Sequence, residues 1–288
     1  MRVKRVAAVA ACLLVALVPA PAVALDVLPG DPGERTDMAV YHDGGRWSGS
    51  PGAKDPRPAL SLAKLYLGYW ILHNGKTEDK GKVWRMVRAS SDGLAVELDR
   101  KYPKAIDEVA KEFELTATVS AGYWGRSSTS PYDMAKFINL VKDDPVAEPM
   151  IRAMANHTLY AEDGFAQDFG TDRLNGVIGT KFGWSDDRSG AVASVSFGRD
   201  FAVAAMTYGD VDDHTEDVLE WIDQTEQGRR VFGHAGQVAG TTGAAGEMPW
   251  WLGPRGQKRP VPTLRPGLKG HFVWINRYGF PRQPGIIR

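Results

Sequence analysis

The sequence predicts an α+β fold, in which helices cover an antiparallel sheet. Strand-like segments occur near both ends of the central region, and helical patterns fill the middle. This order favours a sheet whose first and last strands meet. The chain of 288 residues is 43% hydrophobic, with nine Trp, nine Tyr and ten Phe, so it can bury a substantial core. Global disorder is therefore excluded.

The first predicted element is a β-hairpin over residues 38–48, which turns at Gly44-Gly45. A helix is expected from Ser61 to Asn74, because apolar residues recur there at helical spacing and Asn74-Gly75 is a stop signal. Further helices are expected over 83–98, 103–113, 131–141, 146–157 and 214–227. Strands are expected over 176–183, 191–197 and 201–208, the last two joined by a short turn.

Net charge divides the chain into distinct regions, although 35 basic residues balance 35 acidic ones. Residues 229–288 carry ten Lys and Arg against Glu247 alone, and the region before them is acidic. We predict a signal peptide over 1–24, a flexible lead-in over 25–36, a main folded domain over 37–228 and a basic Gly/Pro/aromatic extension over 229–288. The aromatic residues of that extension suggest that it docks on an anionic wall polymer or on the acidic domain.

The N-terminus has the pattern of a secretory signal. A basic start precedes an apolar run over 6–18 and the small-x-small sequence Ala22-Val23-Ala24. The run is too short for a membrane span, and Cys12 leaves open a less favoured lipoprotein form. We expect a secreted protein, associated with the cell wall or free, with no membrane span. Cys12 is the single cysteine, so the mature chain has no disulfide, Cys-zinc site or thiol nucleophile.

No cofactor or metal is expected. The histidines lack ligand spacing, and the acidic run around Asp210 lacks the register of a calcium loop, so we interpret it as the start of a helix. Nucleic acid is not an expected partner of an exported protein.

The most informative chemistry is Ser61-x-x-Lys64 at the start of a helix. Residues i and i+3 lie on one face, so the hydroxyl and the amine can come within hydrogen-bonding distance. A serine needs a base to become a nucleophile, and a lysine can be that base only if its pKa falls. Alone this pair is a weak signal, because a serine cap followed by a surface lysine is common.

Two later motifs give the pair a context. Ser91-Asp92-Gly93 follows in a helical region, and Lys181-Phe182-Gly183 ends a predicted strand. The order S-x-x-K, S-D-N-like and K-T-G-like resembles the serine β-lactamase and D-Ala-D-Ala peptidase superfamily, closest to class A β-lactamases and exported actinobacterial-type serine hydrolases. The flanks 39–45 and 129–135 resemble it as well, and the likeness covers about 37–225. It implies a β-lactamase/transpeptidase-like fold with a reduced helical lobe, because Ser61 and Ser91 are only thirty positions apart.

The resemblance also implies roles. Ser61 would be the acyl-accepting nucleophile, Lys64 its base, Ser91 a proton relay and Lys181 a cation for a substrate carboxylate. The backbone N–H groups of Ser61 and Trp184 would form the oxyanion hole. The expected substrate-binding residues are Asp92, Gly93, Phe182, Gly183 and Trp184.

Three departures from the family pattern stand out. Gly93 occupies the expected asparagine position, Phe182 replaces a threonine and adds bulk, and the interval 116–131 contains no acid that could activate a deacylating water. We therefore expect an exported serine hydrolase acting on a cell-wall peptide or a related amide or ester, with peptidoglycan peptide or a β-lactam-like molecule as ligand. The alternative is a catalytically silent protein of the same fold that binds the wall or a partner, and a true class A β-lactamase is the least favoured.

Overall fold

The computed structural model describes residues 25–224, 250–252 and 258–260. The expected signal peptide lies outside the described residues. So does the basic extension, apart from the short strands β10 (Trp250–Leu252) and β11 (Lys258–Pro260), which pair with each other in antiparallel fashion.

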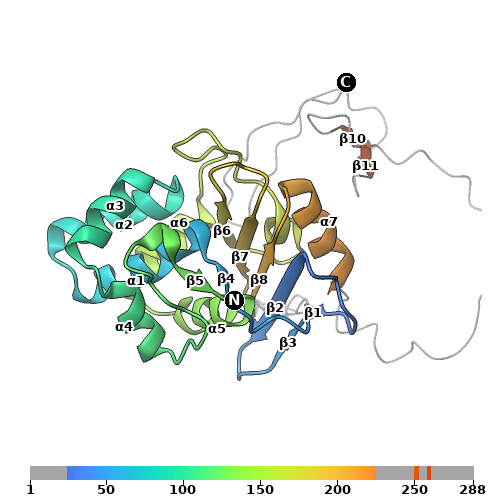
Figure 1. The fold of residues 1–288 in the computed structure, drawn as a ribbon, viewed down its shortest axis with the longest axis horizontal. Helices are drawn as coiled ribbons and strands as arrows, with labels where there is room; N and C mark the ends of the chain where they lie inside the picture. Colours follow the sequence, from blue (N-terminus) through green and yellow to red (C-terminus); the bar gives the residue numbers. More distant parts are fainter. Residues whose placement is uncertain (1–24, 225–249, 253–257, 261–288) are drawn as a thin grey trace, which may run out of the picture.

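A five-stranded antiparallel sheet forms the centre of the fold (Figure 1), in the order β3-β2-β8-β7-β6. Its strands are β2 (Thr36–His42), β3 (Trp47–Gly49), β6 (Gly179–Trp184), β7 (Val192–Phe197) and β8 (Phe201–Thr207). Strand β2 pairs with β8 along its whole length. The expected meeting of the first and last strands is therefore confirmed.

Helices cover both faces of the sheet because successive strand residues point to opposite sides. On β8, Ala202 and Ala204 belong to the main core, into which α5 (Pro131–Val141) packs. Phe201 and Val203 belong instead to a second core, closed by α7 (Val211–Trp221). The helices lie on both faces of the sheet, so the predicted α+β class is confirmed.

Helix α7 begins at the acidic run. The Asp210 carboxylate accepts hydrogen bonds from the backbone N–H groups of Asp212 and Asp213, and the Asp213 side chain accepts one from the N–H of Asp210. This capping box satisfies backbone donors that have no partner within the helix, as expected for acids at a helix start.

The other helices form a lobe beside β6, visible on the left in Figure 1. They are α1 (Ala63–Asn74), α2 (Thr77–Arg88), α3 (Asp92–Lys101), α4 (Ala105–Glu112) and α6 (Glu148–Ala155). Where one helix was expected over 83–98, the structure has two. Ser90 has a left-handed backbone (φ 53), which a right-handed helix cannot include, and α3 starts anew after Ser91.

The lead-in is partly ordered, contrary to the sequence-based expectation for 25–36. Leu25 is fully buried, and β1 (Asp26–Val27) pairs with β9 (Ile222–Asp223). Apolar packing explains this order, because Leu25 and Val27 lie in the same hydrophobic core as Val218 and Ile222.

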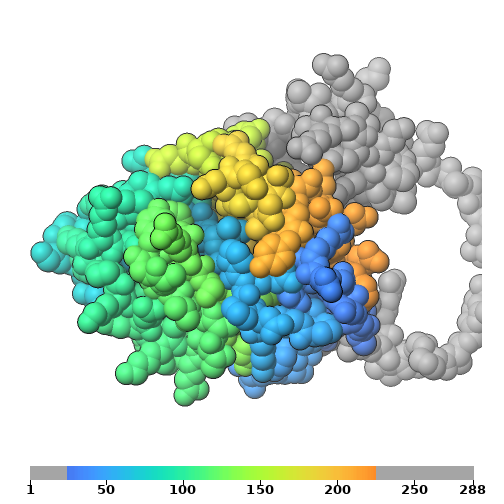
Figure 2. Space-filling view, viewed as in Figure 1, coloured from blue at the N-terminus to red at the C-terminus, as the bar shows by residue number. Residues whose placement is uncertain are grey.

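Several short elements complete the fold. Strand β4 (Arg57–Pro58) pairs with β5 (Ser128–Thr129), and three 3-10 turns are η1 (Leu60–Leu62), η2 (Trp124–Arg126) and η3 (Gly170–Arg173). In the space-filling view the yellow β6–β7 region lies between the helical lobe and the orange α7 (Figure 2). Within the described ranges, no helix is long and apolar enough to cross a membrane.

Candidate active site

Ser61 lies in a strained turn at the base of the helical lobe. It occupies η1 just before α1 and is 8% exposed. The preceding residue, Leu60, has φ 51, a left-handed conformation that is costly for a residue with a branched side chain. Such strain is characteristic of functional sites, because surrounding packing must hold it in place.

Lys64 is one turn further along and points back at Ser61. Its Nζ lies 2.6 Å from the Ser61 Oγ, and the lysine is fully buried. The face of Trp124 covers the amine, with 4.2 Å between Nζ and the ring centroid. Burial lowers the pKa of Lys64, and the Asp92 carboxylate partly offsets that effect. The geometry predicted for S-x-x-K is present, and the pKa of Lys64 is lowered, which is the direction that a lysine base needs.

Ser90, rather than the expected Ser91, lies between the two lysines. Its Oγ is 2.8 Å from the Nζ of Lys181 and 3.4 Å from the Nζ of Lys64. Ser91 caps α3 instead, because its hydroxyl accepts the N–H of Leu94. The left-handed backbone at Ser90 turns the chain so that the first serine faces the lysines and the second begins the helix. The relay position therefore moves by one residue.

This shift also changes the residue at the third position of the motif. Asp92 takes the place that we had assigned to Gly93: its Oδ1 lies 2.6 Å from the Nζ of Lys64. Gly93 is exposed on α3, with no atom within 4 Å of where a Cβ would be. The site thus has a carboxylate, not a missing side chain, at this position.

Lys181 is the second buried amine. It lies on β6, is 1% exposed and donates to the Ser90 hydroxyl and to the Phe182 carbonyl oxygen. Burial, together with the positive charge of Lys64, holds the pKa of Lys181 well below its ordinary value. Ser61, Lys64, Ser90 and Lys181 form a continuous chain of polar contacts. We call it the catalytic cluster, after the role that we propose for it.

Phe182 does not add bulk to the cluster, contrary to the expectation. Its ring is fully buried and packs against Phe169 and His157, with centroids 4.9 and 5.0 Å away. Because strand residues alternate, the neighbour of the inward-facing Lys181 points to the other side of β6. The substitution removes a hydroxyl without obstructing Ser61.

Gly183 lets β6 approach the nucleophile. A Cβ at this position would lie 2.8 Å from the Leu60 Cβ and 3.1 Å from the Ser61 backbone nitrogen, and the first distance is closer than Cβ atoms come. The close approach brings the next residue, Trp184, to the same edge as Ser61. An oxyanion hole formed by the N–H groups of Ser61 and Trp184 stays a prediction.

The segment between α6 and β6 supplies two acids that sequence reasoning missed. Asp163 accepts the indole N–H of Trp184, and Glu162 binds Ser91 and Arg85. These hydrogen bonds lower the pKa of Glu162. Neither acid belongs to a recognisable motif, and only their positions in space place them beside the cluster. The interval 116–131, which has no acid, contributes Trp124 to the wall instead.

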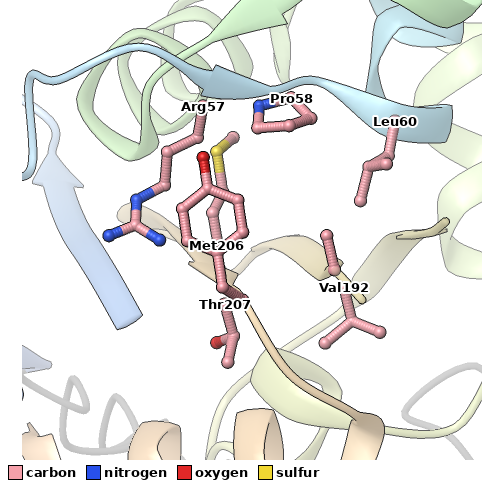
Figure 3. Close-up of a pocket in the computed structure, with 8 residues that line it drawn as sticks. Arg57, Pro58, Leu60, Val192, Met206 and Thr207 are labelled. Carbon is pink, nitrogen blue, oxygen red and sulfur yellow. The ribbon is translucent and has the colours of Figure 1, made fainter. Parts of the chain in front are cut away.

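A small pocket lies next to Leu60 but outside the cluster (Figure 3). It is lined by Arg57, Pro58, Leu60, Ala191, Val192, Met206, Thr207 and Tyr208. The Arg57 guanidinium is already used, because it pairs with Asp37 at 2.6 Å and lies over the Tyr208 ring. We therefore assign this pocket no catalytic role. In the described part of the chain, no group of three or more His, Cys, Asp or Glu side chains could hold a metal ion.

Comparison with solved structures identifies the fold. An ancestral class A β-lactamase matches with a TM-score of 0.51 and 14% identity, over 66% of this chain and 92% of its own. A β-lactamase from Sphaerobacter thermophilus matches with a TM-score of 0.52 and 13% identity, over 64% of this chain and 87% of its own. The chain has the β-lactamase fold. A third structure, the β-lactamase of a halotolerant bacterium, agrees (TM-score 0.51, 12% identity, 65% and 93% coverage).

No protein-family model and no curated protein sequence matches this chain. At 12–14% identity, the structural likeness establishes the β-lactamase/transpeptidase-like architecture that the sequence predicted. It leaves the chemistry to be argued from the residues of this site.

Proposed function

We propose that this protein is an exported serine hydrolase that forms an acyl-enzyme at Ser61. The observation that carries the proposal is the fully buried Lys64 amine, 2.6 Å from the Ser61 hydroxyl. Burial lowers the pKa of Lys64, and a lysine in its neutral form at this distance can remove the hydroxyl proton.

The cluster provides a complete path for that proton. Lys64 takes the proton of Ser61 as the Oγ forms a bond with the substrate carbonyl carbon. As the tetrahedral intermediate collapses, the bond to the leaving group breaks and Ser90 passes its proton to that group, while Lys64 returns a proton to Ser90. Lys181, 2.8 Å from the Ser90 Oγ, donates a hydrogen bond that orients this hydroxyl.

We propose a cell-wall peptide, or a related amide or ester, as the substrate. The likeness of the fold to β-lactamases supports an acyl donor as the substrate, by analogy of fold. Deacylation in the β-lactamase manner needs a carboxylate that activates water. Glu162 is unsuited to that role because Arg85 and Ser91 bind it and hold its pKa low. Without such a base a penicilloyl-enzyme would persist, which favours a D-Ala-D-Ala peptidase-like activity over antibiotic hydrolysis.

A catalytically silent, wall-binding protein is the second candidate. The Lys64–Asp92 ion pair favours it, because a carboxylate 2.6 Å from the amine stabilises the protonated form, which cannot act as a base. The two candidates differ in whether Ser61 becomes acylated.

Export and wall association are part of the proposal and rest on the sequence. The basic start, apolar run and small-x-small site over 1–24 support secretion. The basic residues of 229–288 support binding of the extension to an anionic wall polymer.

A fluorescent penicillin tests the proposal. The protein without its signal segment is incubated with the reagent and separated under denaturing conditions, with Ser61→Ala as the control. We expect a covalent band that persists for hours and is absent from the variant. No band with the penicillin or with a serine-reactive fluorophosphonate would leave the silent protein as the function.

A further inference from the structure

Asp92 is an exposed carboxylate bound to a buried amine. Its side chain is 65% exposed, whereas that of Lys64 is fully buried. Because water solvates the carboxylate on its open side, exchanging one cationic partner for another costs little there. Asp92 is thus the member of the ion pair that a ligand can reach.

Asp92 is distinguished from the other charges that face Lys64. Lys181 approaches from β6, and Glu162 and Asp163 approach from the segment before β6. Glu162 is bound by Arg85, and Asp163 accepts the indole N–H of Trp184. Of the three acids, only Asp92 makes a hydrogen bond to Lys64.

The chemistry of a carboxylate restricts what can replace Lys64 as its partner. An ionised carboxylate only accepts hydrogen bonds, so it binds donors and repels anions. An asparagine, by contrast, both donates and accepts. A ligand carboxylate is thus disfavoured next to Asp92, and an ammonium is favoured.

We propose that Asp92 selects acyl donors that carry an ammonium group, and that docking of this group frees Lys64 to act as the base. The inference rests on the proposed hydrolase function. The ligand ammonium keeps its protons and replaces Lys64 as the counter-ion of Asp92. Lys64 then releases one proton to water, and its neutral amine accepts the hydroxyl proton of Ser61 as the new C–O bond forms.

Two matched esters test the selection. They are p-nitrophenyl 3-(aminomethyl)benzoate and its N-acetyl derivative, which differ in charge at one position. Acylation is followed by nitrophenolate release and by mass spectrometry of the Ser61 peptide. After correction for spontaneous hydrolysis, we expect the wild-type protein to prefer the ammonium ester by about tenfold, a factor typical of a partly desolvated charge pair. High salt reduces the preference.

The variants assign the effect to one carboxylate. Asp92→Asn should reduce the preference to within about twofold, since only the uncharged shape remains. Glu97→Gln is the matched control: it removes the same charge from the same helix, where Glu97 pairs with Lys82, and should keep the preference. Asp92→Asn should also move the pH–rate profile for the acetylated ester to lower pH, a change that a merely structural role would not produce.

The outcomes separate this inference from the hydrolase function. Equal acylation of Ser61 by the two esters in the wild-type protein would overturn the inference and leave the hydrolase standing. An unchanged preference in Asp92→Asn would also overturn it. If Ser61 is acylated neither in the folded wild-type protein nor in folded Asp92→Asn, by these esters or by a fluorophosphonate, the inference and the hydrolase function are both overturned.

Discussion

Two buried polar clusters lie on opposite sides of the sheet. They differ in the charged groups that they contain and in their exposure to solvent. The catalytic cluster contains two buried amines, and its one bonded carboxylate is mostly in solvent. The second cluster, which we call the hydroxyl cluster, contains Thr36, Thr171, Ser194, Thr207 and His214, and Thr36 donates to the buried Asp217 carboxylate. There the His214 nitrogens lie 2.8 Å from the Ser194 Oγ and 2.7 Å from the Thr207 Oγ1.

Under the proposed function, the difference separates stability from reactivity within one fold. In the hydroxyl cluster both ring nitrogens of His214 have partners, so its polar groups stabilise the folded state. In the catalytic cluster the buried amines are only partly compensated, which costs stability but lowers the pKa of a base. Substitutions in the two clusters should therefore have opposite consequences.

The largest expected effect is on catalysis. Lys64→Met should reduce the rate of Ser61 acylation by about a thousandfold, because it removes the base. It should leave the melting temperature unchanged or raise it, since an apolar side chain of similar length replaces a desolvated amine. Stopped-flow labelling and thermal unfolding measure the two quantities, and a large drop in stability would contradict the view that the buried amine of Lys64 is only partly compensated by Asp92.

The corresponding prediction for the hydroxyl cluster concerns pH. Burial lowers the pKa of His214 to about 3, below its value near 6.5 in the unfolded chain. Its contribution to stability is therefore complete above about pH 6.5 and is lost as the pH falls towards 3. Between pH 7 and pH 4 this should cost about 3 kcal/mol of unfolding free energy.

Denaturant titrations of the wild-type protein and His214→Gln at several pH values measure this pH-dependent contribution to the unfolding free energy. The variant is less stable at pH 7, but its stability should depend less on pH over this interval. Labelling of Ser61 should persist in the variant while it is folded. Parallel pH curves would show that His214 is not the group responsible.

The tandem serines provide a matched pair of variants. Ser90→Ala should slow acylation by about a hundredfold, because the relay hydroxyl between the lysines is lost. Ser91→Ala should reduce stability by about 1 kcal/mol, the typical cost of losing a helix cap, and change acylation little. The reverse pattern would restore Ser91 as the relay, which is the assignment made from the sequence, and would contradict the shift to Ser90.

The smallest effect concerns the approach of β6 to the nucleophile. Gly183→Ala places a Cβ against Leu60 and Ser61. We expect acylation to slow by about tenfold, because a small displacement of a reacting group is costly. The hydroxyl cluster should be unaffected, so the pH dependence of unfolding should match that of the wild-type protein.

Much of the fold follows from the sequence, because alternating strands and helical spacing are local patterns. The β2–β3 hairpin, α5 and the β7–β8 hairpin were predicted close to their observed bounds. Ser61 and Lys64 meet as expected, because a spacing of three residues across the junction of η1 and α1 places both side chains on one face. The orientation of Phe182 away from the cluster also follows from strand alternation, although the sequence analysis did not use it.

What the sequence could not provide depends on single dihedral angles and remote segments. The choice between Ser90 and Ser91 rests on one left-handed residue that is not glycine. The preference of serine for helix caps was a usable signal, because Ser91 directly precedes the first turn of α3. Glu162 and Asp163 reach the site from a segment without a motif, so only the packing of the chain places them there.

The most direct test of the account is labelling of the wild-type protein with a serine-reactive fluorophosphonate, followed by mass spectrometry of the peptides. We expect a single adduct on Ser61, formed much more slowly in Lys64→Met and absent from Ser61→Ala. An adduct on another serine, or equal rates in the wild-type protein and Lys64→Met, would show that the buried lysine does not activate Ser61.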